Sequence, residues 1–147
     1  MKDLNAYLPL VVLWAKKHHD LIQEQGFELN EEGMELARSV GVAEPERIRV
    51  MLVDNIPFQE DPVVFSLAKS VGMLSGQVMG LTLGHALYIV KGYESSRLYS
   101  HEFRHIHQYE MLGSIGAFME VYLEQVMKFG YHQAPLEQDA RQFEAGY

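Results

Sequence analysis

Two histidines and a glutamate near residue 100 have the residue types and the spacing of a metal-dependent hydrolytic site. The segment from His101 to His105 reads HEFRH, an HExxH pattern, inside a stretch with helical periodicity. Residues four apart on a helix lie one turn above each other, so both imidazoles can reach one metal ion. At 100° per residue, Glu102 falls about 100° round from His101, beside the imidazoles and suited to take a proton from a water on the metal. Each residue alone is ordinary on an amphipathic helix, but the three together favour a zinc site.

The third ligand decides which kind of HExxH site this is. A glycine three residues and a histidine six residues after His105 would indicate a metzincin, but these positions hold Gln108 and Met111, which excludes that class. His107 lies about 240° round the helix from His101, so it is better interpreted as a partly exposed residue than as a ligand.

Helical geometry also indicates which of the glutamates after the motif could be the third metal ligand. Glu110, about 180° round from His101, cannot turn back to the metal, and Glu124 should face solvent. Glu120 flanks the apolar face of its helix and is not excluded, whereas Glu144 lies near the chain end. Glu137 is better placed, because it falls in the first turn of a separate helix that can fold back on the motif helix.

The order of these segments carries a family resemblance. HEFRHIHQYE, a helix with Gly113 and Phe118, GY at 130–131 and APLEQDAR at 134–141 together resemble a small zincin-like metallopeptidase of the gluzincin type. The resemblance covers residues 80 to 141, and in that group a glutamate from a downstream helix is the third ligand. It implies that His101, His105 and Glu137 hold Zn²⁺, with Glu102 as general base.

The same resemblance implies a substrate-binding edge. The stretch from Gly80 to Leu83 matches the strand along which an extended peptide lies in such enzymes, although a buried strand with a glycine bend fits it equally well. Tyr131, His132 and Tyr109 are candidates by position for stabilising the oxyanion. The usual acidic partner of a zinc-bound histidine is not identified, because the nearest acid, Asp139, lies about 200° round the helix from Glu137.

Turn and cap signals divide the chain into mostly helical segments. Apolar residues at helical spacing, Leu10, Leu13, Trp14, Leu21 and Ile22, predict a first helix that buries this face. Asn30, Asp61 and Ser96 are predicted helix caps. We expect helices over 4–25, 30–41, 62–71, 97–111, 113–128 and from 135 onward, and strands over 47–53 and, as two short strands or one bent strand, 78–90.

These elements predict an α+β fold with a zincin-like core, in which a small sheet with mostly helical surroundings supports the HExxH helix. The length of 147 residues and the 48% hydrophobic content predict one domain over 1–147, with N-terminal helices over 4–41 and a catalytic core over about 47–147.

The composition limits the kinds of molecule that the protein is expected to bind. A net charge of −8 argues against nucleic acid, and no apolar run approaches the roughly 20 residues of a membrane span. The absence of cysteine leaves any metal to histidine and carboxylate ligands and fits a cytoplasmic protein. The sequence leaves the oligomeric state open.

The sequence therefore predicts a zinc metallopeptidase that acts on a peptide or protein substrate. The alternative is a catalytically inactive zincin-like module that binds metal or another protein.

Overall fold

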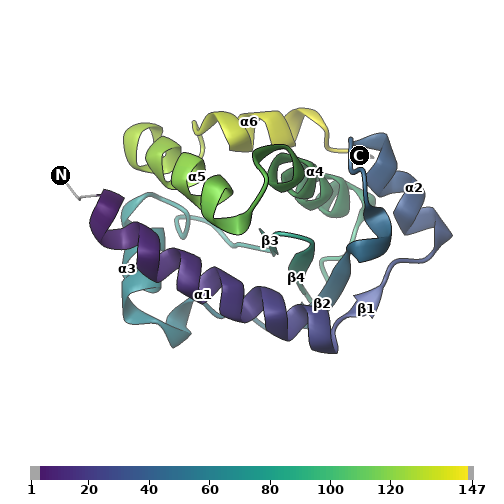
Figure 1. Ribbon diagram of the computed structural model, residues 1–147, viewed down its shortest axis with the longest axis horizontal. Coiled ribbons are helices and arrows are strands. Elements are labelled where there is room, and N and C mark those ends of the chain that lie inside the picture. The colour runs from purple at the N-terminus through teal and green to yellow at the C-terminus, as the bar shows by residue number, and fades with distance from the viewer. Residues whose placement is uncertain (1–3, 146–147) are drawn as a thin grey trace.

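The computed structural model describes residues 4–145, which form an α+β fold of six α-helices and a four-stranded mixed sheet (Figure 1). The helices are α1 (Leu4–Gln25), α2 (Glu31–Ser39), α3 (Pro62–Ser70), α4 (Ser96–Leu112), α5 (Ile115–Phe129) and α6 (Pro135–Gln142). The strands are β1 (Phe27–Glu28), β2 (Arg49–Val53), β3 (Gly80–Leu83) and β4 (Ala86–Val90), and short 3-10 turns lie at Pro45–Arg47 and Phe58–Glu60. The predicted fold class is confirmed. Among residues 4–145, no helix combines the length and apolar character that crossing a membrane requires.

The sheet has the strand order β1-β2-β4-β3. Its central pair, β2 and β4, is parallel, with Val50 opposite Leu87, and the two outer pairs are antiparallel. Gly84 has φ +69° and, with His85, forms the two-residue turn between β3 and β4, where glycine adopts a left-handed conformation without strain. Strand β3 ends the sheet on one side, so the predicted edge strand is confirmed, and β1 ends it on the other.

Alternation along the strands builds a separate apolar core on each face of the sheet. Tyr88 of β4 faces a core that includes residues from α1, α3 and α5, whereas its neighbours Leu87 and Ile89 face a core with α2 and α4. Phe103 and Ile106 of α4 are fully buried in the second core. Helix α4 is thereby held against the sheet, with α5 and α6 beside it (Figure 1).

Local signals set the ends of α4. The side chain of Ser95 accepts a hydrogen bond from the Leu98 backbone N–H at 3.1 Å, so the cap lies one residue before the predicted Ser96. Gly113, with φ +101°, ends the helix in the left-handed conformation that glycine tolerates best. The caps predicted at Asn30 and Asp61 are confirmed, because both side chains accept bonds from the first turn of their helices.

The buried face of α1 differs from the prediction. Leu10 and Leu13 are 44% and 69% exposed, whereas Trp14 and Ile22 are buried as expected. The face turned to the core also contains His18, which is 1% exposed and whose Nδ1 lies 2.6 Å from the Tyr88 hydroxyl. A polar side chain with a buried partner therefore occupies a position that apolar periodicity does not reveal.

Candidate metal centre

The structure brings His101, His105 and Glu137 together where α4 packs against the first turn of α6. Their ligand atoms all lie within 4.8 Å of one another. The Nε2 atom of His101 is 3.1 Å from Glu137 Oε1, and the Nε2 atom of His105 is 3.1 Å from Glu137 Oε2. Both imidazoles therefore point at a single carboxylate supplied by a different helix.

The donor set fits a zinc ion. Two imidazole nitrogens and one carboxylate match the three protein ligands of a catalytic zinc site, which keeps its fourth position open. Ligand atoms about 2.0–2.2 Å from a tetrahedral zinc are about 3.3–3.6 Å apart. Each histidine lies 3.1 Å from a different oxygen of Glu137, within a few tenths of an ångström of that spacing, and the ligand atoms of all three residues lie within 4.8 Å of one another.

Each histidine is oriented through its other ring nitrogen. The Nδ1 atom of His101 is 2.9 Å from Glu144 Oε2, and the Nδ1 atom of His105 is 2.8 Å from Gln108 Oε1. When each Nδ1–H donates to its oxygen, the Nε2 lone pair is free for a metal. The acidic partner that the sequence left unidentified is therefore Glu144 for His101. For His105 the partner is the side-chain amide of Gln108.

A polar network holds Gln108 in place. Its Nε2 atom donates to Asp139 Oδ2 at 2.8 Å and to the Leu136 carbonyl at 2.9 Å. Asp139 also accepts from Arg104, whose guanidinium lies 3.6 Å from the centre of the Phe143 ring. Asp139 thus acts on His105 through Gln108, from the face of α6 that the sequence analysis judged too remote.

Glu144 offers a test of this orienting role. We expect Glu144→Ala to weaken zinc binding about 10- to 100-fold, the usual cost of losing an outer partner of a metal-bound histidine. A chelator competition titration of purified protein measures this affinity. The exposed Glu120 provides the matched control, since Glu120→Ala removes the same side chain away from the cluster. Equal affinity in the Glu144 variant and the wild type would contradict the orienting role.

Electrostatics in the cluster favour protonated imidazoles when no metal is bound. Burial opposes charge on His105, but the Glu137 carboxylate outweighs it and raises the His105 pKa to about 9. Burial likewise opposes charge on His101, and the bond to Glu137 still raises its pKa. For Glu137 the burial that would raise the pKa is overcome by the two histidines, which hold it well below its ordinary value.

Zinc affinity should therefore depend steeply on pH. A metal binds neutral imidazole, so a zinc ion must displace the proton that His105 holds below pH 9. We expect the binding constant to rise about tenfold or more per pH unit between pH 6 and 8, and to level off above about 9. Titrations against a chelator, corrected for the chelator's own protonation, measure the slope. A constant affinity over this range would show that neither histidine is a ligand.

Glu102 is buried beside the cluster with one carboxylate oxygen engaged. The Thr82 hydroxyl donates to Glu102 Oε1 at 2.7 Å, and the Tyr109 hydroxyl donates to the Thr82 carbonyl at 3.0 Å. The other oxygen, Oε2, makes no hydrogen bond within residues 4–145 and lies against Gly80, where an added Cβ would come within 3.1 Å of it. The edge strand therefore fixes the carboxylate and leaves Oε2 available.

The contact with Gly80 gives a second test. Gly80→Ala should displace the Glu102 carboxylate by a few tenths of an ångström, because the new methyl group would meet its Cγ at 3.0 Å. We expect any hydrolysis that uses Glu102 as a general base to fall about tenfold or more, since small displacements of a reacting group are costly, while zinc affinity is unchanged. A variant with full hydrolytic activity would show that this packing does not position Glu102.

Two adjacent hollows adjoin the cluster. A small inner cavity of about 40 Å³ lies among His105, Glu137, Tyr122 and apolar side chains of α5. An outer cavity of about 350 Å³ is lined by His101, by Glu144 and by the chain leading into β3. Gly80, Glu102 and Tyr131 line both, so the cluster has an opening toward the edge of the sheet.

The candidates for oxyanion stabilisation occupy different places. Tyr131 lines both hollows, and its hydroxyl makes no hydrogen bond within the described residues. Burial and the carboxylate of Glu137 raise the pKa of Tyr131, so the hydroxyl keeps its proton. Its neighbour His132 is exposed and lines neither hollow. Tyr109 is buried and already bonded to Thr82.

Tyr122 was not identified from the sequence as part of the site. Its hydroxyl donates to Glu137 Oε2 at 2.7 Å, so it supports the carboxylate from α5. In the sequence this tyrosine lies among mostly apolar residues at helical spacing, and only the tertiary packing shows that its hydroxyl reaches α6.

A second cluster, formed by Glu44, His85 and Glu110, also gathers metal-binding residue types. Its groups have other partners: Glu110 accepts the backbone N–H groups of Ala43 and Glu44 at 2.8 and 3.0 Å and pairs with His85 at 2.9 Å. Glu44 pairs with Arg47. This cluster joins the loop after α2 to the end of α4 through hydrogen bonds. Glu110 therefore points away from His101, as predicted.

Comparisons with protein-family models, curated proteins and solved structures find no match to this chain. The sequence and the geometry together give a possible His-His-Glu metal site on an α+β fold.

Proposed function

We propose that this protein is a zinc-dependent peptidase with a zincin-like core. The observation that carries the proposal is the convergence of His101, His105 and Glu137 beside the buried carboxylate of Glu102. A metal site with a structural role alone would need no buried base pointing at an open hollow. Here Glu102 lines both hollows next to the metal ligands.

Each side chain of the site has a separate role in the proposed hydrolysis. When bound by His101, His105 and Glu137, zinc would supply a Lewis acid that polarises the scissile carbonyl and acidifies water. Glu102 Oε2 takes the proton of the water whose oxygen attacks the carbonyl carbon. It then delivers this proton to the leaving nitrogen as the C–N bond breaks. The hydroxyl of Tyr131 donates a hydrogen bond to the oxygen that gains negative charge.

The edge strand suggests how the substrate is held. Among the described residues, one side of β3 has no neighbouring strand, and its first residue, Gly80, lines the outer cavity together with Glu102. An extended peptide could pair with the backbone there and present its carbonyl to the cluster. Thr82 is less accessible, because its carbonyl already accepts from Tyr109.

The test is a broad library of internally quenched fluorescent peptides, incubated with zinc-loaded protein and with the same protein after chelation. Cleavage that disappears with the chelator and returns with zinc would support the peptidase. If no peptide is cleaved although the protein holds one zinc ion, the alternative of an inactive metal-binding module is favoured.

A further inference from the structure

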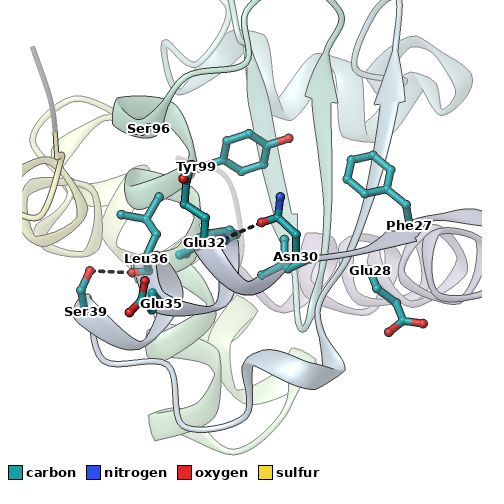
Figure 2. A pocket seen from close by; sticks show the side chains of 12 residues that line it. Phe27, Glu28, Asn30, Glu32, Glu35, Leu36, Ser39, Ser96 and Tyr99 are labelled. Atoms are coloured by element: carbon teal, nitrogen blue, oxygen red, sulfur yellow. Dashed lines mark hydrogen bonds between the residues drawn. The ribbon is translucent and has the colours of Figure 1, made fainter.

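A further recess lies at the edge of the sheet opposite β3. This acidic groove, with a volume of about 700 Å³, is formed by β1, the length of α2 and the first half of α4 (Figure 2). Its apolar wall includes Phe27, which is 47% exposed, together with Leu36 and Tyr99. An aromatic ring exposed in a hollow offers an anchoring contact for a large apolar side chain.

The charged residues that line the groove are all acidic. Glu28, Glu32 and Glu35 line it, and among residues 4–145 no lysine, arginine or histidine does. All three glutamates are exposed and make no ion pair or hydrogen bond within residues 4–145. Within the part of the chain that the structure describes, their charges are therefore not neutralised, and they favour a cationic ligand.

Two polar side chains of the groove wall, Asn30 and Ser39, are hydrogen-bonded to the backbone of α2. Asn30 accepts the Gly33 backbone N–H at 2.8 Å, and the Ser39 hydroxyl donates to the Leu36 carbonyl at 2.6 Å (Figure 2). These bonds fix the first and last turns of α2, so the groove is preformed by a capped helix. Binding there would cost little ordering of the protein.

The groove and the metal centre lie on opposite faces of α4. With His101 at zero, Tyr99 and Phe103 fall at about 160° and 200° round the helix, whereas His105 and Glu102 fall at about 40° and 100°. The groove is lined by Ser96, Tyr99 and Phe103, and neither hollow at the metal centre includes these residues. An occupant of the groove would leave the metal ligands free.

We propose that the acidic groove is a docking site for a basic segment of another protein. In that segment, lysine or arginine side chains would pair with Glu28, Glu32 and Glu35, and an aromatic or large aliphatic side chain between them would pack on Phe27 and Tyr99. The glutamates select a positively charged segment, and the contact with Phe27 and Tyr99 fixes the position of that segment in the groove. This proposal does not depend on hydrolytic activity.

Fluorescence polarisation with a labelled peptide tests the proposal. The probe has one phenylalanine flanked on each side by two lysines, and its two controls carry glutamate in place of lysine or serine in place of phenylalanine. We expect saturable binding of the probe that weakens with added salt, and at least tenfold weaker binding of both controls.

Protein variants locate the binding. The double variant Glu32→Gln with Glu35→Gln, and separately Phe27→Ser, should each weaken the probe about tenfold or more. The matched control, Glu120→Gln with Glu124→Gln, makes the same charge change at exposed positions of α5 and should leave affinity within about twofold. Chelation or Glu102→Gln should have no effect. Absence of saturable binding, equal losses in both double variants, or loss of binding with Glu102→Gln would overturn the proposal.

Discussion

Glu102→Gln is expected to lower peptide hydrolysis by about 10²- to 10⁴-fold, the range that a positioned general base contributes, while zinc affinity stays close to that of the wild type. The amide is nearly isosteric and still accepts the hydrogen bond from Thr82, which in the wild type reaches Oε1 at 2.7 Å. It cannot accept a proton at Oε2. The two quantities to measure are the initial rate on a cleaved peptide and the zinc dissociation constant of the same preparation.

Two other results for this variant would contradict the assignment. A large loss of zinc affinity would make Glu102 a ligand and not a base. Undiminished hydrolysis would remove it from the reaction altogether. Glu120→Gln, an amide substitution at an exposed position of α5, controls for the loss of a negative charge and should change neither quantity.

Glu137→Gln is expected to weaken zinc binding by more than about 100-fold, beyond what loss of an outer partner causes. The substitution removes the anionic ligand that lies 3.1 Å from both imidazoles. It should also abolish hydrolysis, because the open metal site no longer forms. Chelator competition and metal analysis after dialysis give the affinity and the stoichiometry.

The metal-free form of this variant provides an independent readout. Without the Glu137 carboxylate, the pKa of His105 should fall from about 9, because the buried ring loses the charge that favours its protonation. Titration of the imidazole signals by NMR detects this change without any metal. A Glu137 variant that binds zinc as tightly as the wild type would exclude α6 from the site.

Local geometry explains what the sequence could predict. The HExxH spacing places two imidazoles on one helix face whatever the surrounding fold, and caps such as Asn30 and Asp61 act within a few residues. Glu137 was accessible to the same reasoning, since its place in the first turn of a short helix limits the directions it can take.

Long-range packing explains what the sequence could not predict. Glu144 reaches His101 across 43 positions because the chain after α6 returns along α4, where the Ala145 backbone N–H donates to Ser100. The exposure of Leu10 and Leu13 depends on how α1 is rotated against the sheet, and hydrophobicity alone gave the wrong rotation. Helical spacing does place Gln108, three residues after His105, next to that histidine. It was not predicted as a partner because only acidic residues were considered for this role.

The central claim is that His101, His105 and Glu137 bind one zinc ion, and anomalous diffraction from zinc-loaded crystals at the zinc edge tests it most directly. We predict one strong peak about 2.0–2.2 Å from Nε2 of each histidine and from a Glu137 oxygen. A peak at Glu44, His85 and Glu110 instead, or no peak between α4 and α6, would contradict the account.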